Sequence, residues 1–149
     1  MANTTAPAAK SNGTKQAVGL FPVAYQIGGN LIDAPKFTVH LLVNTPNERI
    51  TGYGNITQGV NPPLNIDTKL EGNYTYMTVM PNNSSILVVA TGYPVINWPP
   101  NGGIGPVLMP NVELRMVLSE DWAGGTANYS YVDANGQWHS ITDAPVKKI

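Results

Sequence analysis

NYTYMTVMPNNSSILVVATGYP, residues 73–94, contains two runs of alternating residues around a Pro-Asn-Asn turn, a pattern that predicts two paired β-strands. On both runs the apolar residues fall on both faces of the predicted strand. One face carries Tyr74, Tyr76, Met80, Ile86, Val88 and Ala90, and the opposite face carries Met77, Val79, Leu87 and Val89. A strand pair with two apolar faces needs cover on both sides. We expect a second sheet on one side, and either the loop at 92–111 or another subunit on the other.

The rest of the chain repeats the period-two pattern between clusters of Gly, Pro and Asn, and no longer stretch keeps a helical period. In KFTVHLLV, for example, Phe37, Val39 and Leu41 share one face. Strands are predicted at 18–27, 36–57 (a hairpin), 69–80, 84–91, 111–118 and in a last hairpin at 129–142. The fold class is therefore all-β: a single antiparallel meander of about eight strands, arranged as a sandwich or a closed barrel.

The last hairpin, YSYVDANGQWHSIT, contains an Asn135-Gly136 pair. This pair is typical of a two-residue type I′ turn, whose central residues both need a positive φ. Such a turn would place Asp133 opposite Trp138 and Tyr131 opposite Ser140.

Two regions are expected along the chain of 149 residues. Residues 1–16 are polar and aperiodic, so we expect a flexible N-terminal arm, and residues 17–149 suit a single β-domain. The chain has no cysteine, no apolar run long enough to span a membrane and no signal-peptide h-region at its start. The expected location is a bacterial cytoplasm, with export without a cleaved signal peptide as the alternative.

Charged residues make up only 11% of the sequence, against about 25% in typical soluble domains. Four of the eight basic residues lie in the two ends of the chain, which leaves four basic against nine acidic residues between them. A nucleic-acid partner is not expected, because it would require a basic surface. The weakly charged surface instead favours association with further copies of the chain.

Several stretches, namely VGLFPVAYQIG, LLVNTPNERITGYGNITQ, NPPL and NYTYMTVMP, resemble a small bacterial family known only as domain of unknown function 1842. The resemblance covers residues 18–95. It implies a bacterial origin and brings no catalytic or binding residues with it, because the family has no assigned activity.

No motif predicts catalysis, a cofactor or a metal ion. The only histidines, His40 and His139, lie outside any metal-binding or catalytic pattern and are expected at the surface. DANGQWHSITDA, residues 133–144, begins like a calcium loop, but Gly136 and Ala144 do not fit its sixth and twelfth positions. The chain is therefore not expected to be an enzyme; a glycosidase-like pair of carboxylates is the alternative.

Two functions follow from these patterns. The first is a non-enzymatic, self-associating β-domain, a structural or scaffold subunit of a homo-oligomer that associates through Met77, Val79, Leu87 and Val89. The second is a lectin-like module in which the 92–111 loop binds a glycan through Tyr93, Asn97, Trp98 and Asn101. Trp98 and Trp122 each have two interpretations, because an indole in a loop either packs beneath it or stacks on a ligand.

Overall fold

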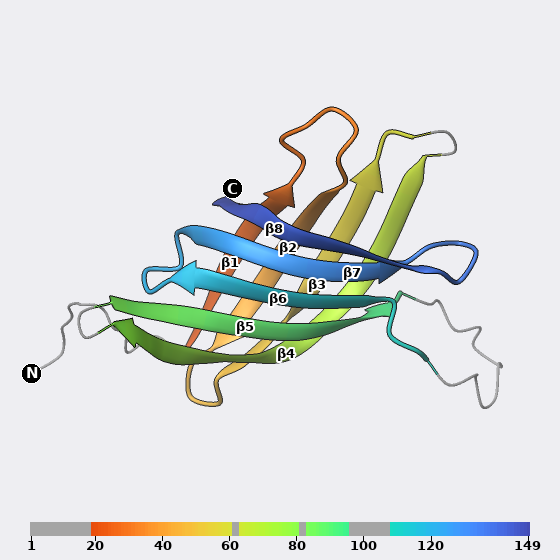
Figure 1. Cartoon of the computed structure of the whole chain (residues 1–149). Helices are drawn as coiled ribbons and strands as arrows, with labels where there is room; N and C mark the ends of the chain where they lie inside the picture. Colours follow the sequence, from red (N-terminus) through yellow and green to blue (C-terminus); the bar gives the residue numbers. More distant parts are fainter. Residues whose placement is uncertain (1–18, 61–62, 81–82, 96–107) are drawn as a thin grey trace, which may run out of the picture.

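The computed structural model describes residues 19–60, 63–80, 83–95 and 108–149. These residues contain no helix and form one closed antiparallel barrel, in which consecutive strands are neighbours and β1 pairs with β8 (Figure 1). The strands are β1 (Leu20–Gly28), β2 (Lys36–Asn44), β3 (Arg49–Gln58), β4 (Leu64–Met80), β5 (Asn83–Pro94), β6 (Val112–Ser119), β7 (Gly124–Val132) and β8 (Trp138–Lys148). The prediction of an eight-stranded meander is confirmed. Of the two predicted arrangements, a sandwich and a closed barrel, the structure has the closed barrel.

The strands are strongly staggered around the barrel. A row of register partners that leaves β4 at Ile66 passes through β3, β2, β1, β8, β7, β6 and β5. It returns to β4 at Tyr76, ten residues from its start. Stagger and strand tilt are linked in a closed sheet. The barrel is accordingly flattened into two layers whose strands cross steeply, and the long strand β4 passes from one layer to the other (Figure 1).

Three glycines lie where the backbone of a neighbouring strand leaves no room for a side chain. A Cβ added at Gly72, in the middle of β4, would collide with the main-chain oxygen of Val89 on β5. Gly52 and Gly125 stand in the same relation to the main chains of β2 and β6. Glycine is needed at these positions because no side chain fits between the two backbones.

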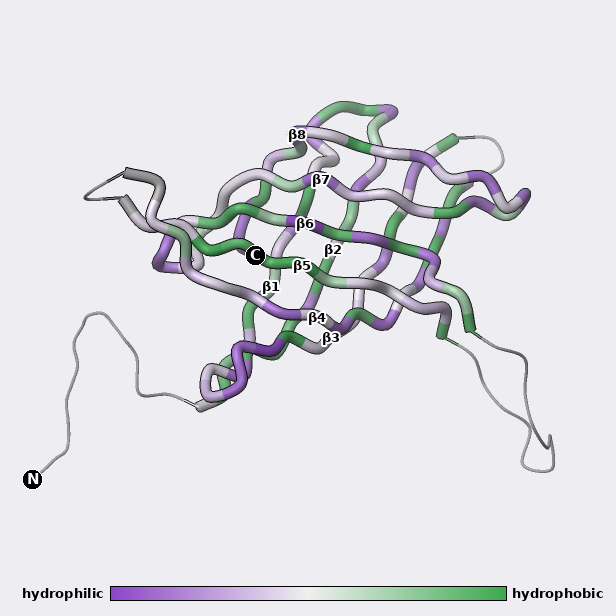
Figure 2. The backbone as a smooth tube through the Cα atoms, turned by 60° about the horizontal axis from the view of Figure 1, so that its bottom comes forward, coloured by the Kyte–Doolittle hydropathy of each residue, from purple (hydrophilic) through white to green (hydrophobic). Residues whose placement is uncertain are grey.

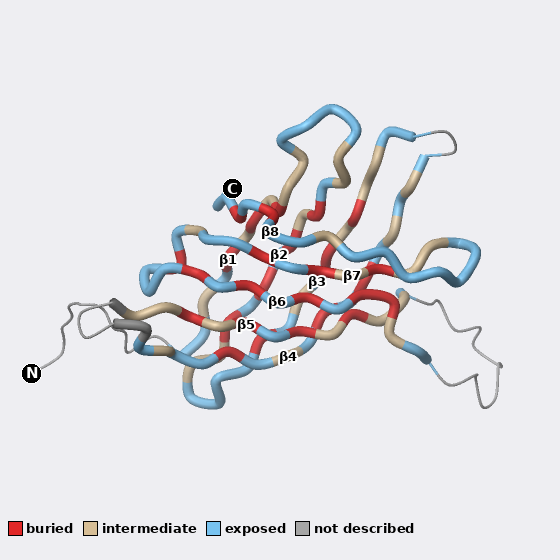
Figure 3. The backbone as a smooth tube through the Cα atoms, in the orientation of Figure 1, coloured by how far each residue is buried: buried red, intermediate tan, exposed pale blue. Residues whose placement is uncertain are grey.

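The core fills the barrel interior with alternate residues from every strand, as the hydropathy and burial patterns along the chain show (Figures 2 and 3). Its largest fully buried side chains include Tyr25, Phe37, Ile27, Ile50, Ile56, Leu70, Ile86, Leu114, Met116 and Leu118. Burial of this apolar surface is the main term that stabilises the fold.

Trp122, in the β6–β7 turn, packs across one end of the barrel. Its indole is buried and meets the rings of Phe21 and Tyr74 edge-on, at centroid distances of 5.5 and 5.0 Å. The main-chain oxygen of Trp122 accepts a hydrogen bond from Tyr25 Oη. Of the two interpretations of Trp122, the structure therefore supports packing within the fold.

The last hairpin forms where it was predicted, with Asn135 and Gly136 in its turn, but the predicted register was wrong by one residue. The structure pairs Val132 with Trp138 and Tyr131 with His139. The N–H group of Gly136 donates a hydrogen bond to Asp133 O. Of the two central residues predicted for the turn, Gly136 has a positive φ and Asn135 does not, so the turn is not type I′. The Asp133 carboxylate decides the geometry, because its Oδ1 accepts hydrogen bonds from the main-chain N–H groups of Asn135 and Gln137. A side chain that bonds its own turn in this way outweighs the preference of the Asn-Gly pair.

Candidate functional site

The inner face of the β4–β5 pair belongs to the core. Tyr74, Ile86, Val88 and Ala90 are buried there, as expected for the face covered by a second layer. The opposite face lies outside the barrel, where Val89 is 41% exposed and Met77 and Leu87 are partly buried. Three of the four residues predicted for self-association therefore share one outer surface; the side chain of the fourth, Val79, lies outside the described residues.

A fourth apolar side chain joins this surface from β6. Val117 is the register partner of Leu87 and is 41% exposed. The pairing of β5 with β6 places Val117 beside Leu87. We call Met77, Leu87, Val89 and Val117 the outer apolar patch.

Charged residues lie along one side of the outer apolar patch. Arg115 is the register partner of Val89. One row farther along the strands, Glu113 and Glu71 flank Thr91. Among the described residues the only ion pair joins His139 to Asp133, so these three charged side chains have no salt-bridge partner in that part of the chain. The patch thus combines an apolar centre with one basic and two acidic groups available for a partner.

Of the residues predicted to bind a glycan, the structure places Tyr93 alone. It lies near the end of β5, partly buried, as the register partner of Lys69 on β4. Asn97, Trp98 and Asn101 lie outside the described residues. At the far end of the same connection, Leu108 and Met109 are 37% and 70% exposed.

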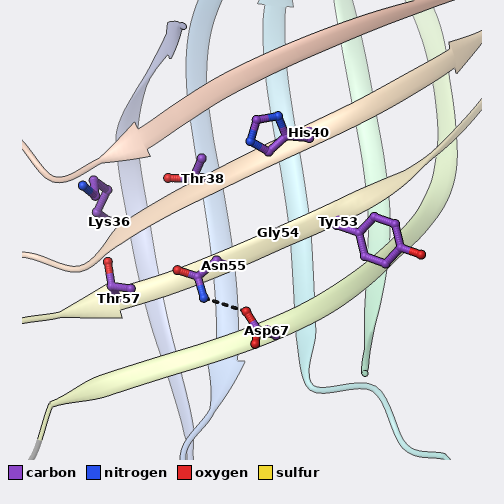
Figure 4. A pocket seen from close by; sticks show the side chains of 8 residues that line it. All are labelled: Lys36, Thr38, His40, Tyr53, Gly54, Asn55, Thr57 and Asp67. Atoms are coloured by element: carbon purple, nitrogen blue, oxygen red, sulfur yellow. Dashed lines mark hydrogen bonds between the residues drawn. The ribbon is translucent and has the colours of Figure 1, made fainter. Parts of the chain in front are cut away.

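A shallow polar depression lies on the outer face of β2, β3 and β4, on the layer that crosses the one carrying the outer apolar patch (Figure 4). Its volume is about 420 Å³. It is lined by Lys36, Thr38 and His40 from β2, by Tyr53, Gly54, Asn55 and Thr57 from β3, and by Asp67 from β4. These residues lie far apart in the sequence and meet because their strands pair. Sequence reasoning expected His40 at the surface and missed the depression.

The side-chain amide of Asn55 is held in one orientation within the depression. Its Nδ2 donates one hydrogen bond of 2.7 Å to Asn65 Oδ1 and another of 2.7 Å to Asp67 Oδ1, both on the neighbouring strand. Figure 4 shows the bond to Asp67. Both amide hydrogens are therefore used, and Oδ1 of Asn55 is left as an acceptor. The depression thus contains a polar group whose orientation is set before any ligand arrives.

His139 and Asp133 form a second polar cluster at the tip of the β7–β8 hairpin. His139 Nε2 lies 2.7 Å from Asp133 Oδ2, and its ring stacks on Tyr131 at a centroid distance of 5.3 Å. This hydrogen bond, with those from the N–H groups of Gln137 and Asn135, holds the pKa of Asp133 below its usual value. Every bond in the cluster ties the hairpin to itself, so we assign it a structural role.

Neither a metal centre nor a membrane-spanning helix occurs in the described part of the chain. No group of three or more His, Asp or Glu side chains there is arranged to hold a metal ion. None of the described segments forms a helix long and apolar enough to cross a bilayer.

Comparison with known protein families gives a match over most of the chain. The family model described as Domain of unknown function (DUF1842) matches residues 18–138, which is most of the chain. This confirms the resemblance seen in the sequence and extends it beyond residue 95. No curated protein matches the chain.

Proposed function

The chain belongs to the DUF1842 family, whose function is unknown, and we propose that it is a non-enzymatic, self-associating β-domain that serves as a structural or scaffold subunit. The observation that carries this proposal is the outer apolar patch on β4, β5 and β6. The barrel already has a complete interior core, so these four side chains contribute little to it. Covering them by a second copy would remove their apolar surface from water, which favours association.

The closed sheet limits how two copies can meet. Each strand pairs with a neighbour on both sides, so adding a strand at an open edge is not the natural route. Two copies would therefore associate through side chains on an outer face of the barrel. A symmetric dimer would place the same patch on both sides of the interface. Stable interfaces bury about 800 Å² per partner and surround an apolar centre with polar residues. Thr75, Thr91 and Thr126 lie around the patch and suit that rim.

The flanking charges support the same proposal. In a symmetric contact, Arg115 of one copy would lie near the acidic side chains beside the patch of the other. Pairing across the interface would fix the orientation of the copies more than it would add affinity. Association should therefore weaken moderately at high salt, because exposed ion pairs are screened.

Light scattering on the wild-type protein over a range of concentrations tests the proposal. A mass that rises to a defined multiple of the 15.9 kDa chain supports self-association. A mass of one chain at every concentration would contradict it. Carbohydrate binding is the second candidate function, and the polar depression on β2–β4 is the observation that favours it.

A further inference from the structure

We propose that the polar depression on the outer face of β2, β3 and β4 is a binding site for neutral oligosaccharides. Its lining residues come from β2, β3 and β4 and not from the 92–111 loop that the sequence suggested for a glycan. It is also independent of the outer apolar patch, which lies on the second half of β4 and on β5 and β6. Self-association and sugar binding can therefore be tested apart.

The hydrogen-bonding groups of the depression suit a ligand covered with hydroxyl groups. Thr38 and Thr57 each offer a hydroxyl that both donates and accepts, Lys36 offers donors, and Asp67 offers acceptors. A sugar hydroxyl also both donates and accepts, so it can pair with any of these groups. The fixed amide of Asn55 adds an oriented acceptor, and such preorganisation lowers the entropy lost on binding.

The charge balance of the depression selects against ionic ligands. Its lining holds one lysine and one aspartate, whose charges cancel. Lys69 lies outside the lining, beside Tyr53 on the neighbouring strand. A phosphate or a sulfated sugar would meet the carboxylate of Asp67 as well as the ammonium of Lys36. A neutral ligand avoids that repulsion and still uses both groups as hydrogen-bond partners.

One exposed and one partly buried tyrosine lie along the site. Tyr53 is 59% exposed and lies beside His40, and the same row continues through Lys69 to Tyr93. Neighbouring strands lie about 4.8 Å apart, which puts Tyr53 and Tyr93 about 10 Å from each other along the sheet. A ring with an apolar face and a polar tip suits the C–H face of a sugar. The row is long enough for more than one sugar unit, so we expect oligosaccharides to bind more tightly than monosaccharides.

The size of the depression agrees with this assignment. Its volume of about 420 Å³ falls within the usual range of small-molecule sites, roughly 300–1,000 Å³. Because it is shallow and open to solvent, we expect weak affinity, in the range of about 0.1–10 mM.

Nuclear magnetic resonance titration of the full chain tests the proposal, with neutral cello-, malto-, xylo- and chito-oligosaccharides as probes. We expect at least one probe to shift the amide signals of Thr38, Tyr53, Asn55 and Asp67. Tyr53→Ala and Asn55→Ala should each weaken binding of that probe about tenfold or more, while Tyr53→Phe should retain it because the ring remains. Trp138→Ala is the matched control, since Trp138 is 48% exposed on β8 away from the depression, and it should bind as the wild type does.

Three results would overturn the proposal. The first is that no probe shifts any signal at about 10 mM, the weak end of the expected range. The second is a set of shifts confined to the 92–111 connection and unaffected by Tyr53→Ala. The third is tighter binding of a sulfated oligosaccharide than of its neutral counterpart.

Discussion

Tyr25 Oη donates a hydrogen bond of 2.7 Å to the main-chain oxygen of Trp122, although 97 residues separate the two in the chain. The bond ties β1 to the β6–β7 turn at the end of the barrel that Trp122 covers. Burial raises the pKa of Tyr25 well above its usual value, and the nearby charge of Asp121 raises it further, so the phenol keeps the proton that it donates.

Removing this hydroxyl should cost stability. Tyr25→Phe leaves the Trp122 carbonyl oxygen without its buried donor, a loss of about 1–3 kcal/mol in the free energy of unfolding. Tyr129→Phe is the matched control, because Tyr129 Oη is buried and has no hydrogen-bond partner among the described residues. That variant should be as stable as the wild type or more stable. Urea unfolding of both variants is the measurement, and equal losses would show that the Tyr25–Trp122 bond contributes nothing.

The pairing of β4 with β5 depends on Gly72. Gly72→Ala should lower the free energy of unfolding by more than about 2 kcal/mol, because the new Cβ would collide with the main chain of β5. Gly59→Ala is the control: nothing lies within 4 Å of the position of its added Cβ. Thermal melts of the two variants check this, and an unchanged melting temperature for Gly72→Ala would refute the role given to the glycine.

The acid stability of the β7–β8 hairpin should depend on Asp133. Its pKa is lower in the folded protein than the ordinary value of 3.8, so folding favours the ionised form. The resulting stabilisation is fully present above about pH 4 and is lost as the pH falls through the folded pKa. Asp133→Asn keeps an oxygen to accept from the main chain but does not ionise. Stability of this variant, followed by thermal melting between about pH 6 and pH 2, should fall less steeply than that of the wild type; parallel curves would contradict the assignment.

The strands could be predicted from the sequence because each has one buried face, and alternation such as that from Phe37 to Val43 marks that face directly. The closure of the barrel could not, because it depends on the ten-residue stagger between Ile66 and Tyr76, which is a property of all eight pairings together.

The two candidate surfaces could also be predicted only in part from the sequence. Leu87 and Val89 were predicted from one strand pair. Val117, Asn55 and Asp67 became part of a surface only once their strands were placed side by side. The turn at Asp133 was missed because a local carboxylate competed with the Asn-Gly signal.

The flanking charges give a prediction about orientation. Arg115→Glu would set a third acidic group beside Glu113 and Glu71, so like charges would face each other in a symmetric contact. We expect association to weaken several-fold at low salt, with the loss reduced at high salt by screening. Sedimentation at two salt concentrations measures this, and an effect independent of salt would argue against a charge contact.

The central claim, that the outer apolar patch joins two copies of the chain, is tested most directly by the solution mass of Val89→Lys. A lysine there would bring a second positive charge, beside Arg115, into the apolar centre of the interface and lose its hydration, so association should fail while the barrel stays folded. Leu42→Lys is the matched control, because Leu42 is 42% exposed on the outer face of β2 and Val89 is 41% exposed on β5. Light scattering and thermal melting should show Val89→Lys as a folded single chain and Leu42→Lys with the mass of the wild type. A wild-type mass for Val89→Lys, or the same loss of mass in both variants, would contradict the account.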